Sequence, residues 1–83
     1  MYNKNERILI IGAGGQIGIE LTENLSKLYG NENVIAADLK PIPALSQNPF
    51  ETLDVLNKEA LFAIINKYQI KQVYLLAALL SAT

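Results

Sequence analysis

The residues with the most recognisable chemistry lie in a glycine-rich stretch that follows an apolar run, "ILIIGAGGQIG" at residues 8–18. A glycine-rich turn between a buried strand and a helix directs backbone N–H groups and the positive end of the helix dipole toward one point, where a phosphate fits. Three glycines have the spacing Gly12-x-x-Gly15-x-x-Gly18. The first allows a tight turn, the second lets a pyrophosphate approach the backbone, and the third lets the helix pack closely on the sheet.

This spacing differs from the commonest dinucleotide-binding pattern, G-x-G-x-x-G, which would need a glycine in place of Ile17. Gly14 is an additional glycine within the loop. The alternative interpretation is that the glycines only form a tight turn between a strand and a helix. The loop is therefore a candidate phosphate site whose function depends on the elements and side chains around it.

Asp38 is the second candidate, because it directly follows an apolar run at residues 34–37. An acidic side chain at the end of the second strand can accept hydrogen bonds from a ribose diol, and its charge repels a 2′-phosphate. Asp38 therefore favours NAD over NADP, although Lys40 lies nearby and leaves NADP open. The alternative is a solvated aspartate at a strand end. Asp54 also has two interpretations, a contact with adenine or the start of a helix.

The elements that position these residues follow from the hydrophobic pattern. Apolar runs predict four strands, at residues 7–11, 34–37, 50–53 and 72–80. Helical spacing predicts one helix over residues 15–29 and a second helix that Asn57 caps, while residues 41–49, with three prolines, predict a loop. The alternation predicts an α/β fold, a Rossmann-type open parallel sheet with helices on both faces and strand order 3-2-1-4, of which this chain holds the first half.

The periodicity also predicts which side of each helix packs on the sheet. In the first helix the expected buried residues are the large aliphatic ones, Ile17, Leu21, Leu25 and Leu28. In the second they are Leu61, Ile64, Ile65 and Tyr68.

Composition narrows the classes of function. The 83 residues allow one small domain at most, with seven basic and eight acidic side chains and a net charge of −1. Such a balance argues against binding nucleic acid or a membrane surface. The absence of cysteine and histidine argues against disulfides and the usual zinc sites. No run reaches the length of a signal-peptide core or a membrane span, so we expect a soluble, cytoplasmic protein.

Three segments carry a family resemblance: "GAGGQIGIEL", "LYGNENVIAAD" and "LLAALLSAT". The glycine spacing with Asp38 resembles the extended short-chain dehydrogenase/reductase family, and the three segments together resemble its short-chain type of L-threonine 3-dehydrogenases. The third segment is the most discriminating, because sugar-nucleotide epimerases of the same fold usually carry a histidine there. The resemblance covers nearly the whole chain.

The resemblance implies a set of residues around NAD. It places Gly12, Gly15, Gln16, Ile17 and Gly18 at the pyrophosphate turn, Asp38 at the adenosine ribose with Leu39 and Lys40 beside it, Asp54 and Val55 at adenine, Leu76, Ala77 and Ala78 under the cofactor, and Ser81 toward the substrate. In the family, NAD accepts a hydride from the carbon that bears the threonine hydroxyl, and the product is 2-amino-3-oxobutyrate. The resemblance also suggests a homodimer.

The catalytic pair of the family, a tyrosine with a lysine four positions later, does not occur here. The residues four positions after Tyr2, Tyr29, Tyr68 and Tyr74 are Glu6, Asn33, Gln72 and Ala78. We therefore expect no catalytic residue and no metal ligand in this chain, and interpret residues 1–83 as the NAD-binding N-terminal segment of a larger enzyme. The alternatives are a segment of a nucleotide-sugar epimerase or dehydratase, and a non-catalytic nucleotide-binding or interaction module.

Overall fold

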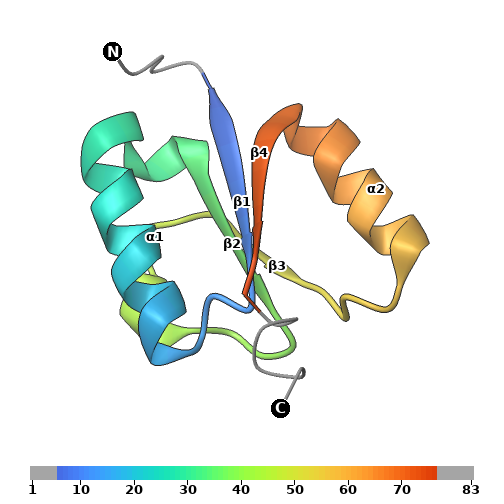
Figure 1. The fold of residues 1–83 in the computed structure, drawn as a ribbon, viewed down its shortest axis with the longest axis horizontal. Coiled ribbons are helices and arrows are strands. Elements are labelled where there is room, and N and C mark those ends of the chain that lie inside the picture. The colour runs from blue at the N-terminus through green and yellow to red at the C-terminus, as the bar shows by residue number, and fades with distance from the viewer. Residues whose placement is uncertain (1–5, 77–83) are drawn as a thin grey trace.

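A computed structural model of the protein describes residues 6–76. Its main elements are β1 (Arg7–Ile11), α1 (Gln16–Tyr29), β2 (Val34–Asp38), β3 (Phe50–Thr52), α2 (Lys58–Tyr68) and β4 (Ile70–Leu75). The strands form one parallel sheet in the order β3-β2-β1-β4 (Figure 1). The predicted fold class and strand order are confirmed. Within residues 6–76, neither helix combines the length and the apolar character needed to cross a membrane.

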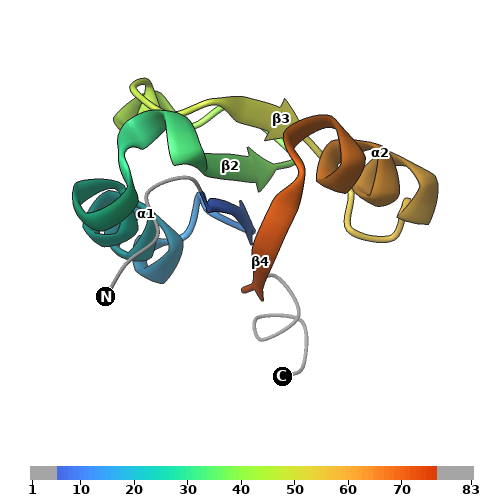
Figure 2. The same cartoon turned by 90° about the horizontal axis from the view of Figure 1, so that it is seen from above.

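The two central strands, β1 and β2, alternate their side chains between two hydrophobic layers. Ile8 and Ile10 face the layer that α1 covers, whereas Leu9 and Ile11 face the layer that α2 covers. Figure 2 shows the two helices on opposite sides of the sheet. Burial on both faces explains why these strands are continuous apolar runs in the sequence.

The predicted buried side of α1 is partly wrong. Ile17 is 71% exposed and Leu28 is 40% exposed, although Leu21 and Leu25 pack on the core as expected. The buried residues of α1 are small ones, Gly18, Thr22 and Ser26.

The small residues bring α1 close to the sheet, and their hydroxyl groups are satisfied within the helix. The hydroxyl of Thr22 donates to the carbonyl of Gly18 at 2.7 Å, and the hydroxyl of Ser26 donates to the carbonyl of Thr22 at 2.7 Å. A pattern based on large aliphatic residues misses this strip, because serine and threonine can face a core once the helix backbone accepts their hydrogen bonds.

The second helix agrees more closely with the sequence. The side chain of Asn57 accepts a hydrogen bond from the N–H of Ala60 at 3.1 Å, which confirms the predicted N-cap. The predicted core side of α2 packs on the sheet as expected. Strand β4 begins at Ile70, ahead of the predicted start at Gln72, because Ile70 pairs with Arg7 across a local irregularity in register. Its predicted continuation over residues 77–80 lies outside the described residues.

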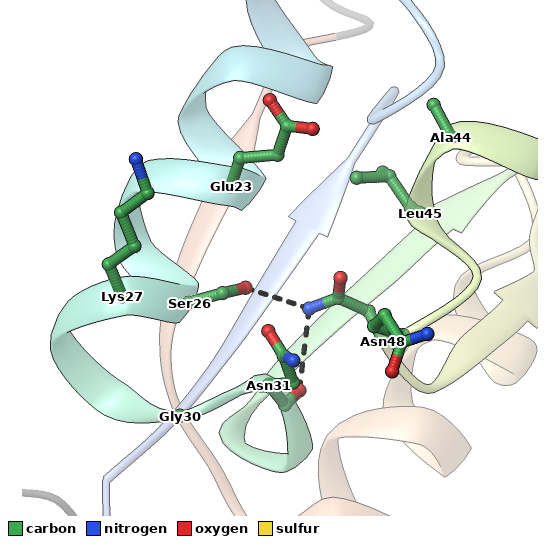
Figure 3. Close-up of a pocket in the computed structure, with 9 residues that line it drawn as sticks. Glu23, Ser26, Lys27, Gly30, Asn31, Ala44, Leu45 and Asn48 are labelled. Carbon is green, nitrogen blue, oxygen red and sulfur yellow. Dashed lines mark hydrogen bonds between the residues drawn. The ribbon is translucent and has the colours of Figure 1, made fainter.

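One side chain anchors the proline-containing loop that leads from β2 to β3. The Nδ2 group of Asn48 donates to the hydroxyl of Ser26 at 2.8 Å, to the carbonyl of Val34 at 2.9 Å and to the carbonyl of Asn31 at 3.3 Å. The first and last of these bonds are drawn in Figure 3. Asn48 thus ties the loop to the end of α1 and the start of β2.

We expect Asn48→Ala to lower the free energy of unfolding by about 2 kcal/mol, because partly buried acceptors lose their donor. The measurement is urea-induced unfolding of the complete gene product, followed by circular dichroism. Gln47→Ala is the matched control, since Gln47 is the exposed neighbour, and it should change stability by less than about 0.5 kcal/mol. Equal stability of the two variants would contradict the anchoring role.

A second tether joins β3 to the last turn of α2. Glu51 accepts hydrogen bonds from the ammonium group of Lys67 at 2.9 Å and from the hydroxyl of Tyr68 at 2.7 Å. These bonds, that of Lys67 first, lower the pKa of Glu51, and the same carboxylate raises the pKa of Lys67. The pKa of Tyr68 is raised, first by desolvation and then by its bond to Glu51.

The tether predicts a pH dependence of stability. Because the pKa of Glu51 in the folded protein lies below its ordinary value of 4.5, its contribution is present above that pH and is lost as the pH falls through the lowered pKa. Glu51→Gln should therefore be less stable than the wild type at neutral pH, by less than about 1 kcal/mol because solvent screens the pair. The difference in unfolding free energy should vanish in acid. The role of Glu51 would be refuted if this difference in unfolding free energy did not depend on pH. It would also be refuted if Glu20→Gln, the control at an exposed glutamate, showed the same difference.

Candidate functional site

The carboxyl ends of three neighbouring strands bring five of the predicted site residues together. A cavity of about 90 Å³ lies at this edge of the sheet and is lined by Ile11, Gly12, Asp38, Leu39, Leu53, Asp54 and Val55. Five of these residues, Gly12, Asp38, Leu39, Asp54 and Val55, were predicted from the sequence. In open parallel sheets, ligands bind at this edge.

The glycine loop is fastened to the end of β2 by its first two N–H groups. Gly12 and Ala13 donate to the carbonyl of Ala37, at 2.9 and 3.2 Å. Gly12 has a φ of 83°, a conformation that glycine adopts without strain. These two N–H groups therefore hold the turn in place and are not directed at a ligand.

The N–H groups that a ligand can use belong to the start of α1. Gly15 is the N-cap and offers no side chain, and the first intrahelical bond runs from the N–H of Ile19 to the carbonyl of Gly15 at 2.9 Å. The N–H groups of Gln16, Ile17 and Gly18 consequently have no acceptor within the helix. Such a group of donors at the positive end of a helix suits a phosphate.

Gly18 lets α1 begin directly against the loop. A Cβ atom at this position would lie 2.7 Å from the carbonyl oxygens of Gly12 and Ala13 and from the Cα of Ala13. All three are backbone atoms, so a side chain would force α1 and the loop apart.

Both oxygens of Asp38 are held by backbone donors. Oδ2 accepts from the N–H of Gly14 at 2.8 Å, and Oδ1 accepts from the N–H of Leu39 at 2.7 Å. The carboxylate is half-buried and keeps lone pairs for a further donor on each oxygen. The sequence marked Gly14 only as an additional glycine, and no local pattern revealed its contact with Asp38.

Asp38 also borders a larger cavity, of about 490 Å³, on the side of the proline-containing loop. This cavity is lined by Gly14, Ile19, Asp38, Leu39, Lys40, Pro41, Ile42, Pro43 and Ala44. Lys40 is exposed here and Leu39 is 63% exposed. The predicted residues beside Asp38 thus lie on the surface around it.

Asp54 has a structural role as well as a place in the smaller cavity. Its Oδ1 accepts from the N–H of Leu56 at 3.0 Å, and its carbonyl accepts from the N–H of Asn57 at 2.8 Å. These bonds form the turn that leads into α2, so Asp54 contributes to the start of this helix whether or not it contacts a ligand. Val55 beside it is half-buried.

Some of the remaining predicted residues are described by the structure and others are not. Gln16 and Ile17 are exposed at the start of α1. Leu76 follows β4, and its N–H donates to the carbonyl of Ile11 at 2.9 Å, next to the glycine loop. Ala77, Ala78 and Ser81 lie outside the described residues.

A cavity of about 630 Å³ lies at the other end of α1 and is lined by Glu23, Ser26, Lys27, Gly30, Asn31, Ala44, Leu45, Gln47 and Asn48. Figure 3 shows that Asn48 reaches across it toward Ser26 and Asn31. Both Ser26 and Asn48 use their polar atoms in the anchor described above. The smaller cavity beside the glycine loop is therefore the better candidate site.

Comparison with known sequences identifies a family. The model of the NAD dependent epimerase/dehydratase family matches residues 8–83. An uncharacterized epimerase/dehydratase of Staphylococcus haemolyticus is 46% identical over 81 residues, which cover 94% of this chain and 26% of the relative. A protein with the same description from Staphylococcus aureus is 38% identical, with 94% and 25% covered. The chain thus spans about a quarter of the length of these relatives.

Solved structures similar to this chain include L-threonine dehydrogenases. The enzyme of Clostridium difficile superimposes with a TM-score of 0.79 and 41% identity, over 84% of this chain and 23% of that chain. The holo form of a GalE-like L-threonine dehydrogenase from Cupriavidus necator gives a TM-score of 0.80 and 40% identity, with the same coverage. The similarity covers the N-terminal part of those enzymes.

Proposed function

Because the chain belongs to the NAD dependent epimerase/dehydratase family, we propose that residues 1–83 are the NAD-binding N-terminal segment of an enzyme that oxidises L-threonine to 2-amino-3-oxobutyrate. Bound NAD would supply the hydride acceptor for this reaction. The segment binds and orients the cofactor, and residues beyond it supply the proton transfer.

The observation that carries this proposal is the juxtaposition of Asp38 with the start of α1. The fixed carboxylate of Asp38 has lone pairs for the two hydroxyl groups of a ribose, and the N–H groups of Gln16 and Ile17 can donate to a pyrophosphate. The smaller cavity, which Asp38 and Asp54 both line, has an apolar wall, Val55 and Leu53, against which adenine can lie. The described residues therefore fit the adenosine half of NAD.

The substrate is supported by similarity to the L-threonine dehydrogenases of Clostridium difficile and Cupriavidus necator, at 41% and 40% identity. The test is the formation of NADH when the complete gene product is mixed with NAD and L-threonine. We expect NADH with L-threonine and little with D-threonine, because the hydride must leave from one face of a positioned carbon. If the protein bound NAD but formed no NADH with L-threonine, L-threonine would be refuted as the substrate, while the role in binding NAD would stand.

Epimerase or dehydratase chemistry on a nucleotide sugar is the second candidate. It is favoured by the description shared by the staphylococcal relatives, which are 46% and 38% identical to this chain. Incubation of the NAD-loaded protein with nucleotide sugars, followed by chromatography of the products, separates the two candidates. An isomerised or dehydrated sugar, without net NADH, would favour this one.

We also propose that the complete protein is cytoplasmic and that it is a homodimer, the latter as the family resemblance suggests. Light scattering on the complete gene product gives its mass in solution. A monomer would refute the dimer without affecting the cofactor site.

A further inference from the structure

We propose that Gly14 is a positioning residue that sets the preference for NAD over NADP by fixing the carboxylate of Asp38. This proposal rests on the proposed function, since it presupposes that Asp38 binds the adenosine ribose. Gly14 lies in the glycine loop but is not one of the three glycines of the spacing Gly12-x-x-Gly15-x-x-Gly18.

Two observations show that the backbone of Gly14 lies against the carboxylate of Asp38. The N–H of Gly14 donates to Oδ2 of Asp38 at 2.8 Å. A Cβ atom at position 14 would lie 2.7 Å from the same oxygen and 3.4 Å from Cγ1 of Ile42. Position 14 is therefore occupied by the only residue that lets the carboxylate rest against the loop backbone.

Alanine at position 14 should perturb Asp38 and little else. The φ of Gly14 is not positive, in contrast to those of Gly12 and Gly30, so an alanine there is not strained by the backbone. The nearest obstacle is the end of the Asp38 side chain, which can rotate. Cγ1 of Ile42, at 3.4 Å, would be in ordinary van der Waals contact with the added methyl group, so the Asp38 carboxylate is the group that must move.

The position of the Asp38 carboxylate matters because a cationic side chain, that of Lys40, lines the same cavity of about 490 Å³. A fixed Asp38 holds its negative charge where the 2′-phosphate of NADP would lie, and this repulsion disfavours NADP. The side chain of Lys40 is exposed at the cavity of about 490 Å³ that Asp38 also lines. Its positive charge could balance the negative charge of a 2′-phosphate once the Asp38 carboxylate had rotated away. The hydrogen bonds from Gly14 and Leu39 oppose that rotation.

The test is the ratio of the dissociation constants for NADP and NAD, measured by calorimetry on the complete gene product. We expect Gly14→Ala to lower this ratio about tenfold, the order expected for one misplaced charge-assisted hydrogen bond. Gly15→Ala is the matched control, because Gly15 belongs to the predicted pyrophosphate turn and the change should weaken both cofactors without changing the ratio. Thermal unfolding of each variant verifies that it folds.

A double-mutant cycle shows whether Gly14 acts through Asp38. In an Asp38→Ala background, Gly14→Ala should leave the ratio unchanged, because the group that it positions is gone. The proposal would be overturned if Gly14→Ala left the ratio of the dissociation constants unchanged in the wild-type background. It would also be overturned if Gly14→Ala changed the ratio equally in the wild-type and Asp38→Ala backgrounds. Neither result would affect the binding of NAD by the wild type. A Gly14→Ala protein that does not fold would also overturn the proposal, because the added methyl group would then disturb more than the side chain of Asp38. A wild type that binds neither cofactor would instead refute the proposed function.

Discussion

Gly18→Ala is expected to weaken NAD binding more than 100-fold and to lower the free energy of unfolding by about 3 kcal/mol. At an open helical position the same change would stabilise the helix by about 1 kcal/mol. Here the new methyl group would lie 2.7 Å from backbone atoms of Gly12 and Ala13, so α1 must move away from the loop. The donors at the start of α1 would then lose their alignment with a pyrophosphate.

Calorimetric titration with NAD and urea-induced unfolding measure the two effects. Asn24→Ala is the matched control, because Asn24 is an exposed residue of the same helix and the change also introduces alanine. We expect it to be neutral or slightly stabilising and to bind NAD normally. Normal NAD binding by Gly18→Ala would mean that the position of α1 does not determine cofactor affinity.

Asp38→Ala is expected to weaken NAD binding about 100-fold, because the ribose loses a charged acceptor that can serve two hydroxyl groups. NADP binding should weaken less or improve, since the repulsion of its 2′-phosphate disappears. The fold should persist, because Asp38 is half-buried and its two hydrogen bonds come from one N–H group of the glycine loop and from the adjacent residue Leu39.

Asp38→Asn separates charge from shape in this prediction. It keeps the size of the side chain and one oxygen acceptor, so its NAD affinity should fall between those of the wild type and Asp38→Ala. The dissociation constants for both cofactors give the answer. Identical NAD affinity in all three proteins would show that Asp38 is only a solvated aspartate at the end of β2.

The central part of the fold could be predicted from the sequence because its signals are local. The apolar runs at β1 and β2 are typical of strands buried on both faces, and a helical pattern between two such runs is typical of a parallel crossover connection. The cap at Asn57 is equally local. These features predicted the strand order that the structure confirms.

Features that depend on how the elements pack against one another could not be predicted. The small residues Thr22 and Ser26 resemble surface residues until their hydroxyl groups are seen to bond to the helix backbone. Asn48 reaches Ser26 across 22 positions of sequence, and no pattern links them.

The same limit applies to the candidate site. The sequence indicated Gly12, Gly15, Gly18 and Asp38 from spacing, and the structure brings Gly12 and Asp38 to one cavity. The bond between Gly14 and Asp38 joins residues 24 positions apart and depends on the distance between the glycine loop and the end of β2. Two adjacent glycines in the loop are compatible with such a contact but do not predict it.

The most direct test of the cofactor site is a calorimetric titration of the complete gene product with NAD, followed by NADP under the same conditions. We expect saturable binding of NAD, with NADP at least about tenfold weaker because of the fixed charge of Asp38. A folded protein that does not bind NAD, or that binds NADP as tightly, would contradict the assignment of this glycine loop and Asp38 to an NAD site.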